Sequence, residues 1–568
     1  MFIPATKKET AALGWDKLDI ILITGDAYID SSFIGVSVIG KVLLNAGYRV
    51  GIIAQPDINS DNDIKTFGEP ELFWGVTSGC VDSMVSNYTA VKKRRKSDDF
   101  TPGGKNEKRP DRAVIAYSNL IRKYFKNTKP IVLGGIEASL RRIPHYDYWD
   151  NKIRRSILFD AKADFLVYGM GEKTTLELAE ALREVKDHSK IRGLAYISQE
   201  APDIKKTITL SSFDEVKSNK ERFSEMFRTF YQNTDPFNAK TIYQKQDTRY
   251  LVLNRPQFPV TEKELDEIYS HDYERDAHPV DKSQGKIKAL DTIRFSVTSH
   301  RGCYGECSFC AITVHQGRIV QSRSEDSIIK EAEKITRLPN FKGILLDIGG
   351  PTANMYGSSC KRMSKKGACT DKSCLYPEQC KSLEVNHNQQ VKLLRKLSKI
   401  KGIKKVFVAS GIRHDLVMND TDSGMLYLEE IIKDHTSGQL KTAPEHLEEK
   451  VLKLMRKSVK KELFEFKEKF FSFTKKHKKK QFLTYYLIAA HPGCDNLAMK
   501  KMRETAIKQL KILPEQVQIF TPTPSTYSTL MYYCEIDPFQ GRKIFVEKDN
   551  RNKEKQKTII TGDNFYKK

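Results

Sequence analysis

The sequence predicts a two-domain α/β protein, in which a doubly wound parallel sheet is followed by an incomplete (β/α)6 barrel. At 568 residues the chain is longer than a single hydrophobic core supports. Short apolar runs alternate with amphipathic stretches in two separate regions, and a polar, proline-containing stretch lies between them. We therefore expect domains at residues 1–200 and 291–537, a connecting segment at 201–290 and a basic tail at 538–568.

In the first domain, strand-length apolar runs end in glycine or aspartate and are interleaved with helical patterns, the clearest at residues 35–46. This alternation is typical of a parallel sheet covered by helices. Ligands on such sheets bind at the carboxyl ends of the strands, so the glycines there either approach a bound group or form simple turns. The expected strands are DIILITGD (19–26), YRVGIIA (48–54), LFWGVTS (72–78), PIVLGGIEA (130–138) and DFLVYGMGE (164–172).

The connecting segment is polar, and we expect only helices in it, around residues 211–231 and 262–269. From residue 291 a second alternation of strands and helices begins, and parallel barrels place their chemistry after the strands. Its clearest helix is 324–336, with Ser324 as N-cap. The expected strands are IRFSVT (293–298), GILLDI (343–348), KVFVAS (405–410), GQLKTA (438–443), FLTYYLIA (482–489) and VQIFT (517–521).

A CxxxCxxC motif, formed by Cys303, Cys307 and Cys310, directly follows the first barrel strand. Three thiolates on one loop can ligate three irons of a [4Fe-4S] cluster and leave the fourth iron open. S-adenosylmethionine (SAM) can bind there through its amino and carboxylate groups, and one electron then releases a 5'-deoxyadenosyl radical. The alternatives are a structural zinc site, which prefers four ligands in two pairs, or three unrelated thiols.

The run RGCYGECSFCAITVHQGRIVQSRS, together with GILLDIGGPTANMYG, resembles the YgiQ-type radical SAM proteins. Further matching stretches are SGIRHDL, LKTAPEHLEE, IAAHPGCD, VQIFTPTP, GDAYID, SDDFTPGG and GGIEASLRRIPHYDYWD. The resemblance covers roughly residues 15–540. It implies a radical SAM barrel and a cluster on the three cysteines, without naming the reaction. A cytoplasmic location is expected on other grounds, because the sequence shows neither a membrane span nor a signal-peptide hydrophobic block.

Several residues after the barrel strands are candidates for binding SAM. Gly349, Gly350 and Pro351 follow the second strand, where radical SAM enzymes carry a glycine-rich motif, although a tight turn would use the same residues. Ser410, Arg413 and Glu445 follow the third and fourth strands and could bind the carboxylate and ribose of SAM, or form structural ion pairs. The loop 315–318 after the cluster motif could shield the cluster, and we assign it no chemistry.

A second group of cysteines lies in an insertion at residues 355–385 and comprises Cys360, Cys369, Cys374 and Cys380. The insertion has little hydrophobic content, so we expect a metal to organise it. Either an iron–sulfur cluster or zinc would fit the ligand count, and free thiols are the alternative.

The first domain resembles the cobalamin-binding domains of some radical SAM methyltransferases. Tyr28 and Glu137 stand where such domains often carry histidine, so the usual lower cobalt ligand is missing and cobalamin is not favoured.

The formal net charge of +24 raises the question of an RNA partner, although the lysines are spread along the chain. No stretch is apolar enough for a membrane span, and we expect no membrane partner. The function predicted is a radical SAM enzyme with an unidentified substrate and a flavodoxin or ferredoxin as electron donor. The alternatives are a radical SAM enzyme that modifies tRNA or another RNA, and a non-enzymatic RNA-binding protein organised by zinc.

Overall fold

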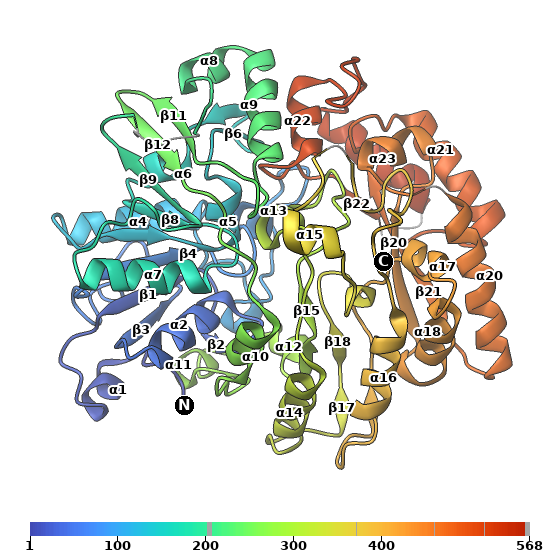
Figure 1. The fold of residues 1–568 in the computed structure, drawn as a ribbon, viewed down its shortest axis with the longest axis horizontal. Coiled ribbons are helices and arrows are strands. Elements are labelled where there is room, and N and C mark those ends of the chain that lie inside the picture. The colour runs from blue at the N-terminus through green and yellow to red at the C-terminus, as the bar shows by residue number, and fades with distance from the viewer. Residues whose placement is uncertain (202–206, 371, 459, 516, 563–568) are drawn as a thin grey trace. The chain divides into compact units, whose positions relative to one another are not determined.

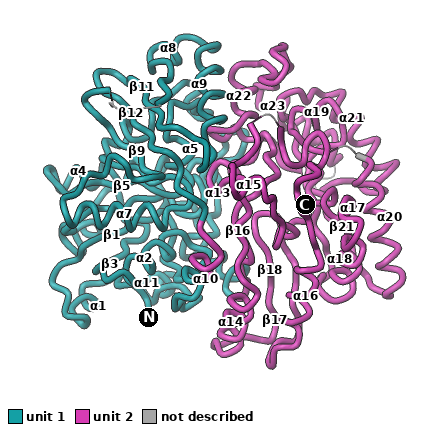
Figure 2. The backbone as a smooth tube through the Cα atoms, in the orientation of Figure 1, with its two compact units in different colours: residues 1–259, 267–294 teal, residues 260–266, 295–568 magenta. Residues whose placement is uncertain are grey.

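The chain forms two compact units in a computed structural model (Figure 2). Unit 1 comprises residues 1–259 and 267–294, and unit 2 comprises residues 260–266 and 295–568. The structure describes residues 1–201, 207–370, 372–458, 460–515 and 517–562. In these residues, no helix combines the length and the apolar character needed to cross a lipid bilayer.

Unit 1 is built on a nine-stranded sheet with the order β10-β11-β12-β9-β8-β5-β4-β1-β3 (Figure 1). Its five strands from β3 to β8 are mutually parallel, and each lies within one of the predicted apolar runs, which confirms the doubly wound prediction. All five residues of β1 are buried, as expected for a central parallel strand. These strands are β1 (Ile20–Thr24), β3 (Val50–Ala54), β4 (Phe73–Thr77), β5 (Ile131–Leu133) and β8 (Phe165–Val167).

The helices of unit 1 follow the predicted amphipathic stretches. Helix α2 (Gly35–Asn45) matches the expected helix at 35–46 and buries Val38, Val42 and Leu43. The other main helices of this unit are α4 (Ala113–Tyr124), α5 (Gly135–Leu140), α7 (Glu172–Arg183), α8 (Phe213–Ser218) and α9 (Lys220–Gln232).

The segment expected to be a mere connection extends the sheet of unit 1 instead. Strands β9 (Leu194–Ser198), β12 (Arg249–Leu253) and β11 (Ile242–Gln246) pair antiparallel, and β10 (Ile208–Thr209) adds a parallel edge. Buried polar side chains are accommodated in this sheet because they form hydrogen bonds with one another. The Gln246 side chain donates to the Gln244 side chain at 3.0 Å, and both are buried.

Unit 2 contains the six predicted barrel strands, and every pairing between them is parallel. The second predicted strand is split into two short pieces, which pair with the first and third strands; a bridge between Ile412 and Thr442 joins the third to the fourth. Within the described residues no pairing joins the last strand to the first, so the barrel is open. The strands are β14 (Ser296–Thr298), β17 (Ile344–Leu345), β18 (Asp347–Gly349), β19 (Lys405–Val406), β20 (Gln439–Glu445), β21 (Phe482–Ala489) and β22 (Val517–Ile519).

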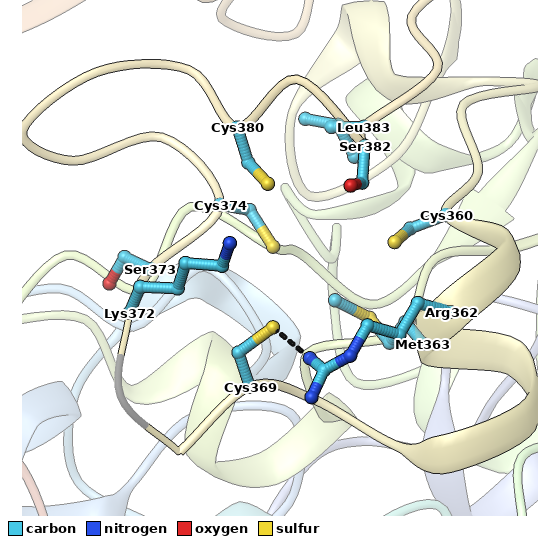
Figure 3. Close-up of a pocket in the computed structure, with 10 residues that line it drawn as sticks. All are labelled: Cys360, Arg362, Met363, Cys369, Lys372, Ser373, Cys374, Cys380, Ser382 and Leu383. Atoms are coloured by element: carbon cyan, nitrogen blue, oxygen red, sulfur yellow. Dashed lines mark hydrogen bonds between the residues drawn. The ribbon is translucent and has the colours of Figure 1, made fainter.

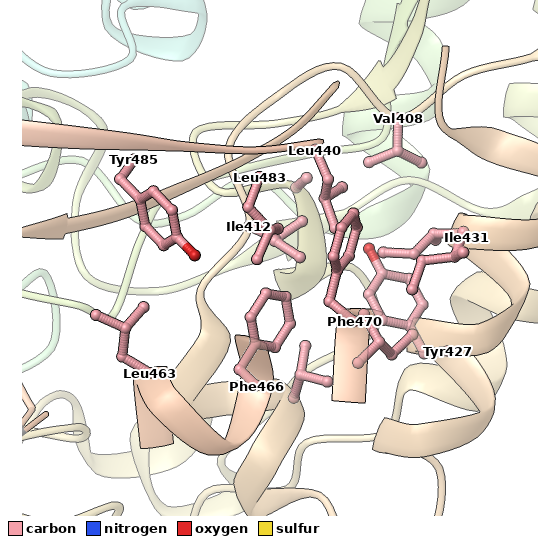
Figure 4. Packing of buried hydrophobic residues seen from close by; sticks show 14 of the residues in the cluster. Val408, Ile412, Tyr427, Ile431, Leu440, Leu463, Phe466, Phe470, Leu483 and Tyr485 are labelled. Carbon is pink, nitrogen blue, oxygen red and sulfur yellow. The ribbon is translucent and has the colours of Figure 1, made fainter. Parts of the chain in front are cut away.

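Helices pack against these strands around one apolar core (Figure 4). Helix α14 (Glu325–Thr336) has the predicted cap, because the Ser324 hydroxyl accepts a hydrogen bond from the Ser327 amide at 3.1 Å. Phe466 and Phe470 of α20 (Lys460–Lys476) are fully buried in the core. Further helices of this unit are α13 (Ala311–Gln316), α16 (His387–Leu397), α17 (His414–Asn419), α18 (Gly424–Glu430), α19 (Glu449–Met455), α21 (Asn496–Thr505) and α22 (Tyr527–Cys534). The division between the units falls within α10 (Glu262–Ser270).

The expected basic tail at residues 538–568 contains a packed helix, α23 (Asn550–Thr561). Gln556 is fully buried; its side chain accepts a hydrogen bond from the Ala490 amide at 2.9 Å and donates to the Cys494 carbonyl at 3.1 Å. Ile560 is also fully buried in the core. The helix therefore belongs to the fold of unit 2: Gln556, Ile560 and even Lys553, whose ammonium donates to the Tyr532 hydroxyl, face inward.

Candidate functional site

The CxxxCxxC motif forms a tight loop between the first barrel strand and α13. Gly302 takes a φ of +80°, and a Cβ there would lie 2.1 Å from the Ile319 carbonyl oxygen, so only glycine fits. The Cys303 amide donates to the Gly317 carbonyl at 3.1 Å, and the Cys310 amide donates to the Cys307 carbonyl at 3.0 Å. These contacts fold the three cysteines into one compact turn.

The three thiols are electrostatic neighbours of one another. Burial and the adjacent Cys307 raise the pKa of Cys303, and burial together with the other two thiols raises the pKa of Cys310 to about 12. The described residues contain no three His, Cys, Asp or Glu side chains grouped as around a single metal ion. Three thiolates on one loop can ligate three irons of a [4Fe-4S] cluster, whereas a structural zinc ion needs a fourth ligand from outside the loop.

The loop His315 to Arg318 braces this turn from outside. The Gln316 side chain accepts a hydrogen bond from the Gly302 amide at 3.0 Å. Arg318 pairs with Glu306, inside the motif, at 3.1 Å, and both side chains are largely buried. These contacts hold the loop against the cysteine turn.

Arg413 directs its guanidinium at the cluster motif. Its Nη1 donates to the Cys307 sulfur at 3.6 Å, while Nε donates to Asp415 at 3.0 Å and Nη2 to the other Asp415 oxygen. Burial disfavours the charged forms of Arg413 and Asp415, but the attraction between the two charges is stronger than this effect. The pKa of Arg413 is therefore raised, and the pKa of Asp415 is held well below its usual range. A Cβ at Gly305 would lie 2.8 Å from Arg413 Nη1, so glycine makes this approach possible.

The glycine motif lies against the base of the same loop. A Cβ on Gly350 would come within 2.6 Å of the His300 ring, and a Cβ on Gly349 within 2.7 Å of the Ser410 hydroxyl. Burial lowers the pKa of His300 to about 4, and its Nε2 donates to the Thr352 carbonyl at 3.0 Å. The Thr352 hydroxyl is 3.8 Å from the Cys303 sulfur, so the segment containing Pro351 leads directly to the thiols.

Ser410 is held by a residue that the sequence analysis did not select. Its hydroxyl donates to Asp347, whose other carboxylate oxygen accepts the Ala409 and Ser410 amides at 2.8 and 3.1 Å. The signal was an acidic residue inside an apolar strand, two positions before Gly349. Asp415 was missed too, although it lies two residues after Arg413. Asp347 thus positions Ser410, and Asp415 positions Arg413, the two residues proposed from the sequence as SAM-binding candidates.

Glu445 ends β20 with a φ of +68°, a left-handed conformation that is unfavourable for glutamate. Burial raises the pKa of its carboxyl to about 7, although Lys457 and Arg413 oppose this shift. Its charge also raises the pKa of Cys310, so it lies near the thiols. Backbone strain of this kind is common at ligand sites.

The second cysteine group surrounds a cavity (Figure 3). The sulfur atoms of Cys360, Cys369, Cys374 and Cys380 all face this space. Burial, followed by the charges of Glu306 and the other three thiols, raises the pKa of Cys374 to about 12. The structure thus brings together all four residues that the sequence analysis grouped.

In unit 1, the two positions compared with a cobalt ligand make internal contacts. The Tyr28 hydroxyl accepts a hydrogen bond from the Ile3 amide at 2.8 Å, and its ring stacks on His278 at 5.4 Å. The Glu137 carboxylate accepts the Ser83 amide at 2.8 Å and the Val114 amide at 3.3 Å. Both side chains thus contribute to the internal hydrogen bonding of unit 1.

The sequence was compared with protein families and with known proteins. The family model "Radical SAM N-terminal" matches residues 2–296, more than half of the chain. A UPF0313 protein of Fusobacterium nucleatum is 57% identical over 561 residues, covering 99% of this chain and 98% of that protein. The chain belongs to the UPF0313 family of radical SAM proteins. UPF0313 proteins of Thermotoga neapolitana and Clostridium botulinum are 49% and 46% identical, covering 98% and 86% of those proteins.

Solved structures give this UPF0313 chain the fold of cobalamin-binding radical SAM enzymes. The radical SAM methyltransferase TsrM from Kitasatospora setae, with cobalamin and a [4Fe-4S] cluster bound, matches with a TM-score of 0.50 and 14% identity, covering 90% of this chain and 73% of that chain. The cobalamin-dependent SAM radical enzyme OxsB, with aqua-cobalamin bound, matches with a TM-score of 0.50 and 12% identity, covering 92% and 57%. At these identities the likeness concerns the fold alone.

Proposed function

We propose that the protein is a radical SAM enzyme whose Cys303, Cys307 and Cys310 hold a [4Fe-4S] cluster with one iron open to SAM. The observation that carries this proposal is the pairing of a three-cysteine loop, placed directly after the first barrel strand, with a buried guanidinium 3.6 Å from the Cys307 sulfur. The fold and the family support the same assignment.

The cluster with SAM supplies one-electron cleavage of a carbon–sulfur bond, which gives a 5'-deoxyadenosyl radical able to abstract hydrogen from a substrate. The protein supplies binding and positioning. Arg413 stabilises the negative charge of the ligating Cys307 sulfur, and Asp415 fixes its orientation. In the glycine motif, Gly349 is fixed by its carbonyl, which accepts from the Ser299 amide at 2.7 Å and hydroxyl at 3.1 Å. The backbone after it, from Gly350, would accept hydrogen bonds from the SAM amino group, and Pro351 fixes the chain there.

Glu445 and Ser410 have different parts in this proposal. Glu445 would accept hydrogen bonds from the ribose hydroxyls of SAM, and these donors would stabilise the carboxylate against the burial that raises its pKa. Ser410 acts through Asp347 as a positioning residue for the loop after the third strand. The electron comes from a low-potential carrier of the flavodoxin or ferredoxin class.

Cobalamin is not included in the proposed function. TsrM and OxsB bind it, but in this chain Tyr28 and Glu137 are engaged in buried internal hydrogen bonds. The substrate of the radical is left open, because its contacts depend on barrel loops that no comparison assigns.

The proposal is tested by incubating anaerobically reconstituted protein with SAM and dithionite and measuring 5'-deoxyadenosine. We expect product from the wild type and from Cys80→Ala, a cysteine in unit 1, and at least a hundredfold less from Cys307→Ala. Wild-type protein with a full complement of iron that forms no 5'-deoxyadenosine, in the presence of cell extract as a substrate source, would contradict the proposal.

A further inference from the structure

We propose that Cys360, Cys369, Cys374 and Cys380 hold a second iron–sulfur cluster, next to the cysteines of the first. The four sulfur atoms come from three different parts of the insertion and face one shared cavity (Figure 3). Four cysteines are the usual protein ligand set of a [2Fe-2S] or [4Fe-4S] cluster and of a structural zinc site.

The insertion is shaped to bring these cysteines together. The amide and carbonyl of Ser359 form hydrogen bonds of 3.0 and 2.8 Å with the carbonyl and amide of Glu384, so a backbone bridge joins the two ends of the segment. Cys360 directly follows this bridge, and Cys380 lies four residues before its other end. The Cys380 amide donates to the Cys374 carbonyl at 2.8 Å, which holds the last two cysteines in one turn.

Apolar packing alone does not account for this shape. In the described part of residues 357–386, the buried apolar side chains apart from the cysteines are Met363, Ala368, Leu375 and Leu383. The one helix there, α15 (Lys361–Lys366), has six residues and carries exposed lysines. So small a core cannot balance the conformational entropy of about thirty ordered residues, at roughly 1–2 kcal/mol each. Metal binding supplies the missing free energy in segments of this kind.

Positive charge is placed where thiolate ligands would need it. Arg362 of α15 donates a hydrogen bond to the Cys369 sulfur, and Lys372 lines the same cavity. Four thiolates around an iron–sulfur core carry net negative charge, which a guanidinium and an ammonium stabilise. Neutral thiols have no comparable need for these two cations.

A single zinc ion is the alternative for these four thiols. Zinc would serve only to hold the insertion together, whereas an iron–sulfur cluster can also exchange electrons. The position of the insertion beside the first cysteine group therefore favours a cluster over zinc.

The two cysteine groups are neighbours within unit 2. Cys360, Cys374 and Cys380 pack against the same apolar cluster that contains Cys303. The C-terminal end of α19 contacts both cysteine segments. The Ser308 amide, in the first segment, donates to the Met455 carbonyl at 3.0 Å, and Arg456, directly after the helix, donates to Ser373 in the insertion. A cluster with four protein ligands has no open iron, so this second site would hold electrons close to the first cluster without binding SAM.

Metal analysis of anaerobically purified full-length protein tests the proposal. We expect about eight irons and eight acid-labile sulfides per wild-type chain, and about four of each in the triple variant Cys303→Ala, Cys307→Ala, Cys310→Ala. That variant keeps the insertion intact, so its iron reports on the second site alone. Cys80→Ala serves as a control and should match the wild type.

A further substitution tests whether the iron that remains in the triple variant is bound by the insertion. Cys374→Ser, a nearly isosteric change, should lower the iron content of the triple variant from about four to less than one per chain. A triple variant that contains zinc without sulfide, or no metal, would overturn the proposal. This outcome is distinct from failure of the proposed function, in which the triple variant keeps its iron but wild-type protein forms no 5'-deoxyadenosine.

Discussion

Gly350 lies where any side chain would collide with the ring of His300. A Cβ there would be 2.6 Å from two ring atoms, and the ring cannot move freely because its Nε2 donates to the Thr352 carbonyl. The same ring position helps to hold Thr352 near the Cys303 sulfur. A methyl group on residue 350 would therefore disturb both the packing around His300 and the backbone proposed to bind SAM.

Gly350→Ala should therefore lower the free energy of unfolding by about 1–3 kcal/mol, as overpacking does in a close-packed site. It should also weaken SAM binding at least tenfold, measured by equilibrium dialysis on reconstituted protein. Gly411→Ala is the matched control, since a Cβ there has no heavy atom within 4 Å. Equal effects of the two substitutions would show that the contact with His300 is unimportant.

Arg413 and Asp415 form a buried ion pair in which both side chains are less than a tenth exposed. Arg413→Gln would leave the Asp415 carboxylate without its partner, at a cost of about 3–5 kcal/mol in unfolding free energy. The pair between Arg395 and Glu430 has similar geometry, but the arginine side chain is 53% exposed. Arg395→Gln should cost less than about 1 kcal/mol in urea denaturation. A similar cost for both would argue against a buried charge pair at the cluster loop.

At the scale of elements, the regular parallel strands and their helices could be predicted from sequence. Apolar runs of five to eight residues marked β1, β4 and β21, and a serine followed by two acidic residues marked the start of α14. The grouping of the three loop cysteines was also predictable, because Cys303, Cys307 and Cys310 lie close together in the sequence. Positioning contacts such as that between Asp347 and Ser410 span 63 residues and could not be read from local spacing.

The elements that sequence patterns did not predict are polar ones with long-range partners. Strand β11 has the sequence IYQKQ, whose buried glutamines bond to each other and to the Ser211 carbonyl and Ser156 amide. Helix α23 is rich in lysine, and its buried Gln556 contacts residues more than sixty positions earlier. Hydrophobic periodicity is weak in both cases, so they were treated as a connection and a tail.

Gln556→Ala tests the packing of α23. It would leave the buried Ala490 amide and Cys494 carbonyl without partners, so we expect a loss of about 2–4 kcal/mol in unfolding free energy and a lower Tm. Lys555→Ala on the exposed side of the same helix should change stability by less than about 0.5 kcal/mol. If both variants unfold like the wild type, α23 does not pack as described.

For the whole molecule, buried neutral histidines make stability depend on pH. Burial lowers the pKa of His145, His300 and His414 to about 4 and that of His491 to about 3, against about 6.5 in an unfolded chain. Between these values the unfolded chain binds more protons than the folded one. The free energy of unfolding therefore falls as pH drops below about 6.5.

His491→Gln isolates one of these contributions. We expect the variant to be less stable than the wild type at pH 7, because it changes the hydrogen bond of 2.7 Å between His491 and Ser528. Lowering the pH to 5 should narrow this difference by about 2 kcal/mol, since only the wild type carries this titrating group. Urea denaturation at the two pH values measures it. A difference that stays constant would mean that His491 has the same pKa in the folded and unfolded chain, as a solvent-exposed histidine does.

The central claim is that the cluster held by Cys303, Cys307 and Cys310 leaves one iron open for SAM. Electron paramagnetic resonance of the reduced protein, recorded before and after SAM is added, tests this most directly. The account predicts a spectrum whose g values shift when SAM binds, and no such shift in Cys307→Ala. A reduced iron–sulfur signal that is identical with and without saturating SAM in the wild type would contradict it.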